Sequence, residues 1–400
     1  MRKRTADLIK SLNLEIGVPG FVRPGKALDR RVQVVGTGMA DFDYGILGSG
    51  GLPLGTFGTL EGEPSSGKSY IAMMLVASAQ DAWPDRACAW CDAERRLNAM
   101  GQDFMRTRRV NLDELVMLAE ARDTENPRDF YPVLERVLMA VEKLCLSGDF
   151  SVIVVDSIAA TIPLEVWKKY ESHGKSAGPG KRHDAIADEE RLGSLPRALS
   201  KRLRDEIVPA AAYGNTLVVF TTQMRANIVA RQRVAELIAR QEDDELAVGG
   251  RALKFYADWR VRFARIGDIT EGPKSKPGPV VGEDIAVKLI KSTVSRPRTV
   301  TYVDTPGPVQ LWFDGRLWSA TQSLVYCAVQ HGLAEQSGSW VTWRDVKRNG
   351  WAAYAEYLDA NEGLRAELEE EVRARSVLSE ASLAPVAARG FGKLPVGRKT

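Results

Sequence analysis

The sequence predicts an α/β fold in which a mostly parallel central sheet is covered by helices on both faces. Strand-like and helix-like runs alternate from about residue 37 to residue 318, which is the order of a layered α/β domain. Residues 152–155 are continuously apolar, as in a strand that is buried on both faces. A glycine-rich loop, residues 62–69, stands between a strand-like run and an apolar helical run.

Six strands are expected in this core. They are residues 56–61, 87–92, 151–156, 216–222, 259–264 and 285–290. An apolar helix is expected directly after the glycine-rich loop, at residues 71–79. Two long polar interruptions, at residues 165–192 and 225–250, exceed ordinary connections, and insertions of that length are usually functional or disordered.

The remaining segments give the predicted domain organisation. Residues 1–36 hold a short amphipathic segment, in which leucines recur, followed by a linker that Pro and Gly interrupt. Residues 37–320 form the core, and residues 321–376 form a compact C-terminal domain with helices and strands. Residues 377–400 are rich in Ser, Ala, Pro, Gly and basic residues, so we expect a flexible basic tail.

The net charge narrows the possible function classes. The chain has 400 residues with 55 Lys and Arg against 52 Asp and Glu, so its formal net charge is only +3. This excludes a polycation that binds nucleic acid through bulk charge, and the 44% of apolar residues excludes a disordered acidic chain. No apolar run approaches the ~18 residues of a membrane span and no signal peptide is recognisable, so we expect no membrane partner and a cytoplasmic location, in a bacterial or phage-infected cell.

Cys88 and Cys91 have the C-x-x-C spacing of some metal and redox sites. They lie in a strand-like run, where residues i and i+3 point to opposite faces, and no second Cys/His pair lies nearby. We therefore expect buried structural cysteines. The three histidines, at positions 173, 183 and 331, are too scattered to predict a metal site or a general base.

Residues 62–69, Gly-Glu-Pro-Ser-Ser-Gly-Lys-Ser, fit the phosphate-binding pattern G-x-x-x-x-G-K-[ST]. Between a strand and a helix, the backbone N–H groups of such a loop and the helix N-terminus surround phosphates. Lys68 would reach the β- and γ-phosphates, and the Ser69 hydroxyl would ligate Mg²⁺. The alternative, a glycine-rich turn without a ligand, is disfavoured because strand, loop and helix occur in the required order.

A magnesium site beside this loop needs a carboxylate at the end of a neighbouring strand. Asp156 ends an apolar strand-like run and fits this Walker B pattern. Alone it would be interpreted as the cap of the next turn, but beside the loop the metal role is favoured. Hydrolysis also needs a group that activates water. Asp92 and Glu94 follow another predicted strand, and their spacing leaves both open.

Taken together, these runs resemble the bacterial RecA recombinases and their phage UvsX-like relatives over nearly the whole chain. The motifs that carry the resemblance stand in the family's order, at residues 50–55, 88–94, 152–160, 220–225 and 249–256. The last of them, Gly-Gly-Arg-Ala-Leu-Lys-Phe-Tyr, is highly specific. The C-terminal domain also matches in outline, at residues 338–340 and through a helix at 361–375. The resemblance implies a RecA-type P-loop ATPase core, a short N-terminal polymerisation segment and a small α+β C-terminal domain.

The resemblance also implies a nucleotide site for ATP and Mg²⁺. Its nucleotide-binding residues would be Gly62, Glu63, Pro64, Ser65, Ser66, Gly67, Lys68, Ser69, Tyr70, Phe104 and Asp156, with Ser69 and Asp156 at the metal. Glu94 aligns with the glutamate that polarises the attacking water. Phe104 matches the aromatic residue that stacks on adenine, although two extra residues precede it and Tyr is usual there.

Further roles implied by the resemblance concern the signal to DNA and the neighbouring protomer. Gln223 matches the glutamine that senses the γ-phosphate and passes its state to the second DNA loop. Lys254 and Phe255 match positions at the subunit interface, and Lys291 belongs to the segment that reaches the neighbour's ATP site. With Glu94 and Lys68, Gln223 and Lys291 complete the implied catalytic set.

The two long polar interruptions fall where the family's DNA loops lie. In the first, Arg197, Ser200 and Arg204 recur at i, i+3 and i+7, which would place two cations and a hydroxyl on one helix face along a single strand. Alone, this pattern would be interpreted as a solvated helix face. In the second, the implied contacts are Arg225, Ile228, Gly249 and Gly250. Arg225 would contact the backbone, Ile228 would wedge between bases, and the two glycines would donate backbone N–H groups to a phosphate.

Three departures from the family pattern stand out. The lysine pair of the segment that crosses the interface reads Lys291-Ser292-Thr293 here, so one of two cations is lost. Both loops are longer than in bacterial RecA, and neither is net basic. The C-terminal tail is basic, through Arg389, Lys393, Arg398 and Lys399, where bacterial tails are acidic.

The function that the resemblance implies is an ATP-dependent DNA recombinase and DNA-dependent ATPase. It would form a homo-oligomeric helical filament on single-stranded DNA and exchange strands with a homologous duplex. Candidate protein partners are single-strand-binding and mediator proteins. The alternative is a hydrolysis-weak, ATP-gated paralogue that acts as a mediator or scaffold, and Thr293 is the feature in its favour. A hexameric helicase is disfavoured because the chain carries the N-terminal segment and C-terminal domain of filament formers.

Overall fold

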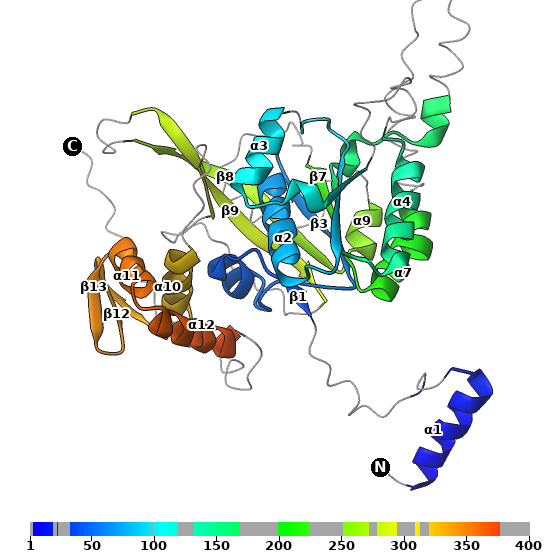
Figure 1. The fold of residues 1–400 in the computed structure, drawn as a ribbon, viewed down its shortest axis with the longest axis horizontal. Coiled ribbons are helices and arrows are strands. Elements are labelled where there is room, and N and C mark those ends of the chain that lie inside the picture. Colours follow the sequence, from blue (N-terminus) through cyan, green and yellow to red (C-terminus); the bar gives the residue numbers. More distant parts are fainter. Residues whose placement is uncertain are drawn as a thin grey trace, which may run out of the picture. The chain divides into compact units, whose positions relative to one another are not determined.

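A mostly parallel β-sheet forms the centre of the fold, as the computed structural model of the chain shows (Figure 1). Among the described residues, eight strands pair in the order β10-β9-β8-β3-β7-β6-β4-β5. Neighbours from β8 to β5 are parallel, while β9 and β10 pair antiparallel, so the predicted fold class is confirmed. The strands are β3 (Phe57–Gly62), β4 (Ala87–Asp92), β5 (Leu115–Leu118), β6 (Phe150–Asp156), β7 (Leu217–Gln223), β8 (Trp259–Thr270), β9 (Val280–Ser292) and β10 (Val309–Trp312).

The structure describes residues 3–18, 22, 33–97, 99–118, 132–168, 199–224, 251–271, 278–293, 309–312 and 320–376. The chain divides into two compact units, Met1–Gln33 and Val34–Thr400, and each is described by itself. In the first unit the amphipathic segment is a helix, α1 (Lys3–Ile16). Gly17 follows it with a φ of 75°, a left-handed conformation that favours glycine at a helix end.

Helices cover both faces of the sheet because buried side chains alternate along its strands. In β6, Val154 belongs to the core cluster on the side of α2, and the next residue, Val155, belongs to the cluster on the side of α4 and α7. This is why residues 152–155 of this strand are all apolar. The helices named here are α2 (Lys68–Ala82), α3 (Ala99–Thr107), α4 (Leu134–Ser147), α7 (Val208–Gly214) and α9 (Arg251–Tyr256).

The two cysteines of β4 follow the same alternation. Cys88 packs in the cluster on the α2 side and Cys91 in the cluster on the α4 side, and both are buried free thiols. Burial raises the pKa of Cys91 to about 12 and also raises that of Cys88, so both remain protonated and are poor metal ligands. The expected buried structural cysteines are confirmed, and among the described residues no group of three or more His, Cys, Asp and Glu could hold a metal ion.

The six predicted strands are all present, but two of them continue well beyond the apolar runs that indicated them. β8 and β9 have 12 and 13 residues and form a long antiparallel hairpin. Beyond Ala264 the hairpin is held partly by polar side chains, such as the ion pair between Arg265 and Glu283 at 3.2 Å. A strand that is solvated in this way has no apolar run. The short edge strand β5 was not predicted, although its four residues are all apolar; only Leu115 of them is buried in the structure.

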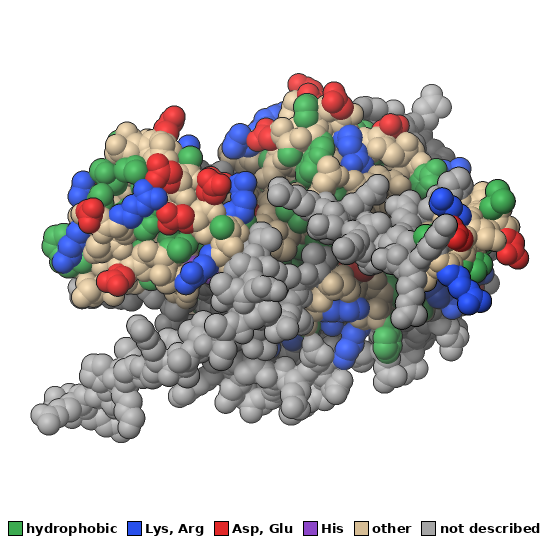
Figure 2. Space-filling model, turned by 90° about the horizontal axis from the view of Figure 1, so that it is seen from below, with side chains coloured by type: hydrophobic (Ala, Val, Ile, Leu, Met, Phe, Trp, Pro, Cys, Tyr) green, Lys and Arg blue, Asp and Glu red, His purple; other side chains and the backbone are tan. Residues whose placement is uncertain are grey.

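The C-terminal residues build a helical layer on a small antiparallel sheet, with a core of their own that includes Val341, Tyr354 and Leu368. The helix expected at residues 361–375 is α12. Figure 2 shows this part on the left, with acidic and basic side chains interspersed over the described surface of that face. The elements are α10 (Ala320–Gln330), β11 (Glu335–Ser337), β12 (Trp340–Trp343), β13 (Val346–Asn349), α11 (Trp351–Asp359) and α12 (Glu362–Ser376).

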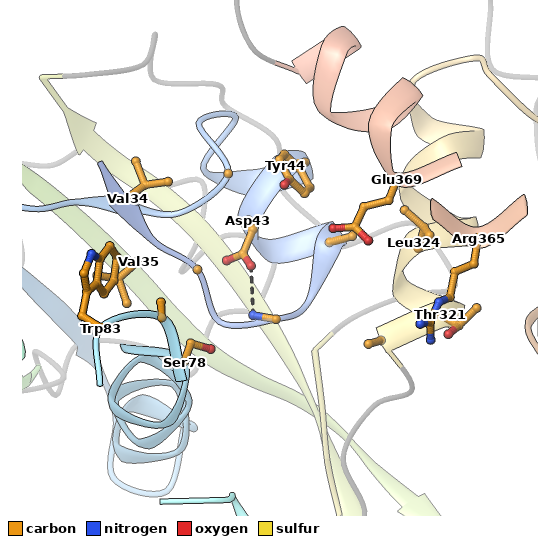
Figure 3. Close-up of a pocket in the computed structure, with 16 residues that line it drawn as sticks. Val34, Val35, Asp43, Tyr44, Ser78, Trp83, Thr321, Leu324, Arg365 and Glu369 are labelled. Atoms are coloured by element: carbon orange, nitrogen blue, oxygen red, sulfur yellow. Dashed lines mark hydrogen bonds between the residues drawn. The ribbon is translucent and has the colours of Figure 1, made fainter. Parts of the chain in front are cut away.

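Two buried carboxylates lie where the central sheet domain meets these C-terminal helices. They belong to a wide helical turn, η2 (Asp41–Ile46), which follows the short strand β1 (Val34–Val35) and precedes β2 (Leu52–Pro53). Asp41 accepts a hydrogen bond from the hydroxyl of Ser323 on α10. Asp43 accepts one from the backbone N–H of Gly38 at 3.0 Å, and lines a cavity of about 460 Å³ between η2, the end of α2, α10 and α12 (Figure 3).

These carboxylates make the stability of the folded chain depend on pH. Burial raises the pKa of Asp41 to about 6 and that of Asp43 to about 7. A raised pKa means that the folded state binds the proton more tightly than the unfolded state. The protonated side chains of Asp41 and Asp43 therefore stabilise the folded state fully below about pH 4. This contribution is lost as the pH rises through their folded-state pKa values.

We predict that Asp41→Asn reduces this pH dependence, since Asn keeps the acceptor for Ser323 and carries no charge. Between about pH 4.5 and pH 7.5 the variant should lose less free energy of unfolding than the wild type, by on the order of 2 kcal/mol. Urea unfolding of the full chain at both pH values measures the difference. The exposed Asp81→Asn is the control and should follow the wild type. Parallel pH profiles for all three proteins would contradict the prediction.

Candidate nucleotide site and nucleic-acid interface

The glycine-rich loop joins the end of β3 to the start of α2, as its sequence predicts. Gly62 has to be glycine, because a Cβ there would lie 2.4 Å from the carbonyl oxygen of Phe263 on β8. Gly67 has a φ of 89° and immediately precedes the helix. The first N–H groups of the 15-residue helix α2 have no intrahelical acceptors, so they point into the loop and favour an anion there.

Lys68 bends back over this loop. Its Nζ donates to the carbonyl oxygens of Gly62 at 3.1 Å and Glu63 at 2.6 Å, and to the Oγ of Ser66 at 3.3 Å. Burial lowers the pKa of Lys68 to about 8, partly offset by the carboxylates of Asp156 and Glu94. A phosphate in the loop would offer this cation a charged acceptor, and would favour its protonated form.

Ser69 and Asp156 lie together, as expected of a magnesium pair. The Oγ of Ser69 donates to Asp156 Oδ2 at 2.7 Å, and the hydroxyl of Thr221 donates to Oδ1. Burial raises the pKa of Asp156, an effect that a bound divalent cation would reverse. A hydroxyl and a carboxylate are hard oxygen donors, and Mg²⁺ is usually held by few protein groups together with phosphates and water. The residues therefore fit the ion.

The geometry separates the two carboxylates that follow β4. Both oxygens of Asp92 accept backbone hydrogen bonds, from the N–H of Arg96 at 3.0 Å and of Leu97 at 2.7 Å, so this residue caps the turn. Glu94 instead points to the neighbouring strand ends. Its Oε1 accepts from Ser157 Oγ at 2.7 Å and from Gln223 Nε2 at 2.8 Å. Of the two carboxylates, Glu94 is therefore the one whose oxygens are held by side chains of the neighbouring strand ends and not by the backbone of the turn.

These groups surround one pocket of about 350 Å³. Of the residues predicted from the sequence, it is lined by Pro64, Ser65, Ser66, Gly67, Lys68, Ser69, Tyr70, Phe104, Glu94, Asp156 and Gln223. Gly62 and Glu63 take part through their carbonyl groups, which hold Lys68. Arg96 was not among the residues predicted from the sequence, yet it lines the same pocket and pairs with Glu94 Oε2 at 2.8 Å. The sequence signal that could have indicated it is the basic pair Arg95-Arg96, which follows the strand-end Asp92 closely.

Phe104 lies on α3 at the rim of this pocket, with 37% of its surface exposed. The guanidinium of Arg108 lies 3.7 Å from the centroid of its ring, and 4.9 Å from that of Tyr70. Arg108 is itself almost fully buried, at 2% exposed. It therefore supports one face of the Phe104 ring from below the surface, a role that the sequence did not indicate.

Lys254, Phe255 and Lys291 form a second group that does not line the nucleotide pocket of the same protomer. The Nζ of Lys291, on β9, donates to the carbonyl oxygens of Phe255 at 3.1 Å and Lys254 at 3.4 Å, at the end of α9. Burial lowers the pKa of Lys291. Phe255 is 68% exposed, and the backbone N–H of Thr293 donates to Asp258 O at 2.9 Å.

Of the residues expected to contact DNA, Ser200 and Arg204 are described. Arg204 lies in a wide helical turn, η6 (Leu203–Ile207), and pairs with Asp205 at 2.6 Å. Both side chains of this ion pair are exposed, so it contributes little and leaves the cation accessible. Arg197, Arg225, Ile228, Gly249 and Gly250 lie outside the described residues, as does the basic tail.

The sheet order, the loop between β3 and α2 and the carboxylate at the end of β6 define a P-loop nucleotide-binding domain of the Walker type. The family model described as RecA N-terminal domain matches residues 3–305 of the chain. The chain therefore belongs to the RecA family, and the predicted resemblance is confirmed; the match does not distinguish bacterial from phage members. Membership supports a general role as a DNA recombinase and ATPase that uses ATP and Mg²⁺. Within the described part of the chain, no helix is long and apolar enough to span a membrane.

We predict that Asp156→Asn weakens the dependence of ATP binding on Mg²⁺. The variant keeps the side-chain shape but loses the charge that faces the metal, so the gain in affinity on adding Mg²⁺ should shrink by on the order of tenfold. Calorimetric titration with a slowly hydrolysed ATP analogue, in Mg²⁺ and in EDTA, measures this gain. The exposed Asp149→Asn serves as the control. An unchanged gain in Asp156→Asn would show that this carboxylate does not hold the metal.

Proposed function

We propose that the protein is an ATP-dependent DNA recombinase. It forms a filament on single-stranded DNA, pairs it with a homologous duplex and exchanges strands, with ATP hydrolysis that DNA stimulates. The observation that carries the proposal is the hydrogen bond between Gln223 and Glu94 at 2.8 Å. It connects the carboxylate of the nucleotide pocket to the last residue of β7, directly before the loop expected to bind DNA.

The residues of the pocket have distinct roles in this proposal. The loop N–H groups and Lys68 bind the phosphates, and Ser69 with Asp156 holds Mg²⁺. When bound, the ion neutralises charge that develops on the β- and γ-phosphates. Glu94 orients the attacking water and accepts its proton. Phe104 stacks on the adenine, on a ring that Arg108 supports.

ATP would act on DNA binding through the end of β7. A γ-phosphate offers the amide of Gln223 an anionic acceptor in place of Glu94. The next residue, Met224, donates its backbone N–H to Gly62 O at 3.2 Å, so the chain that leads to residues 225–250 is tied to the start of the phosphate loop. A change of partner at Gln223 therefore displaces backbone that is already fixed at one end.

The surface of Lys254, Phe255 and Lys291 is proposed as the side that completes a neighbour's ATP site. The exposed ring of Phe255 supplies apolar contact area, and Lys291 supplies a cation. Residues 1–36 would contact the adjacent protomer in the filament, and residues 377–400 would attract DNA lightly. A cation that reaches the γ-phosphate across the interface would couple assembly to nucleotide binding.

A second candidate is a hydrolysis-weak, ATP-gated paralogue that acts as a mediator or scaffold. Thr293, where the family has the second lysine of this segment, favours it. Strand exchange between circular single-stranded DNA and a homologous linear duplex distinguishes the two. We expect ATP-dependent exchange that fails with a heterologous duplex, together with DNA-stimulated turnover. ATP-dependent DNA binding without strand exchange would support the paralogue. A rate of ATP hydrolysis that is the same with and without DNA would overturn the recombinase proposal.

We predict that Glu94→Gln lowers kcat for ATP by about 10²-fold or more, because the amide cannot accept the proton of the attacking water. The variant should still bind ATP, and should hold single-stranded DNA for longer because hydrolysis no longer releases it. Steady-state turnover and DNA retention measured in parallel give both values. Glu114→Gln changes an exposed glutamate and is the control. Normal turnover in Glu94→Gln would remove this residue from the catalytic role.

A further inference from the structure

Arg96 is a basic residue of the nucleotide pocket that belongs to neither the phosphate loop nor the metal pair. Its Nε lies 2.8 Å from Glu94 Oε2, while Glu94 Oε1 is already bonded to Ser157 and Gln223. Both carboxylate oxygens of Glu94 are thus engaged. In this arrangement Glu94 has no oxygen reserved for an attacking water.

The surroundings of Arg96 allow its side chain to change partners while its backbone stays fixed. The backbone N–H is held by Asp92 Oδ1 at 3.0 Å. The side chain is 67% exposed, whereas that of Glu94 is 13% exposed. Water can therefore solvate the guanidinium of Arg96 when the ion pair opens, while Glu94 keeps its hydrogen bond from Ser157.

Arg96 also lies on the boundary between two hollows. It lines the nucleotide pocket together with Lys68 and Ser69. It also lines a second hollow of about 430 Å³ on the other side of Glu94, which the neighbouring Arg95 lines as well. The positive charge of Arg96 is close enough to Lys68 to contribute to lowering its pKa. A γ-phosphate bound by Lys68 would therefore lie in the field of this second cation.

We propose that Arg96 exchanges Glu94 for the γ-phosphate when ATP binds. Without ATP the guanidinium holds the carboxylate of Glu94. With ATP the more highly charged phosphate accepts hydrogen bonds from the guanidinium, in the paired geometry that Arg favours, and Glu94 becomes available for water. Arg96 thus supplies in the same protomer a cation at the γ-phosphate, in the enzyme whose interface segment carries Thr293 instead of a second lysine.

The exchange makes a prediction that binding alone can test, because ADP lacks the γ-phosphate. In Arg96→Ala the affinity for a slowly hydrolysed ATP analogue should fall about 5- to 20-fold, while the affinity for ADP stays within about twofold of the wild type. Arg96→Lys, which keeps the charge but not the planar fork, should recover part of the loss. Arg95→Ala removes the same charge from the adjacent residue, which does not line the nucleotide pocket, and should leave the ratio of the two affinities unchanged.

Turnover gives a second readout. DNA-stimulated kcat of Arg96→Ala should fall about 10- to 100-fold with a smaller change in KM, since the lost contact strengthens as charge develops on the γ-phosphate.

The inference rests on the proposed function, and different results would overturn each of them. Equal ATP-analogue-to-ADP ratios in the wild type and Arg96→Ala, with normal DNA stimulation, would overturn the role of Arg96 alone. A wild type that bound neither nucleotide would overturn the proposed function and the role of Arg96 with it.

Discussion

The carboxylate of Glu94 is the group on which the site depends. It lies just beyond β4, and it accepts hydrogen bonds from Ser157, which follows β6, and from Gln223, which ends β7. Three neighbouring strand ends are thus connected through one side chain. This is possible because parallel strands bring their carboxyl ends to the same edge of a sheet, where ligands bind in such folds. A ligand that replaced Glu94 as the partner of Ser157 or Gln223 would break a hydrogen bond that connects these strand ends.

The phosphate loop is also connected to these strand ends by hydrogen bonds. Lys68 holds the carbonyl groups of the loop, and Met224, directly after Gln223, donates to Gly62 at the start of the loop. The hydroxyl of Ser69 reaches Asp156 at the end of β6. In the proposed function, nucleotide binding would therefore act beyond the loop, since the same backbone continues into the segment expected to contact DNA. Arg96, whose side chain is exposed, is a partner of Glu94 that water can solvate on release.

Much of the site could be predicted from the sequence, because the loop pattern and the strand-end Asp156 are local signals. The spacing alone left the choice between Asp92 and Glu94 open, and only the family resemblance favoured Glu94, because the geometry depends on which carboxylate accepts the backbone N–H groups of the following turn. Arg96 was missed for the same reason: no spacing rule states which side chains meet after a turn. The strand positions followed from apolar runs, yet the solvated half of the β8–β9 hairpin, held by Arg265 and Glu283, carries no such run.

Gln223 is proposed to connect ATP binding to DNA binding, and a comparison of DNA affinities tests this connection. The affinity for single-stranded DNA is compared with and without a non-hydrolysable ATP analogue, for the wild type and for Gln223→Ala, with the exposed Gln330→Ala as control. We expect the analogue to tighten DNA binding at least about tenfold in the wild type and the control. In Gln223→Ala most of this gain should be lost, although the analogue still binds. The same gain in Gln223→Ala would contradict the account.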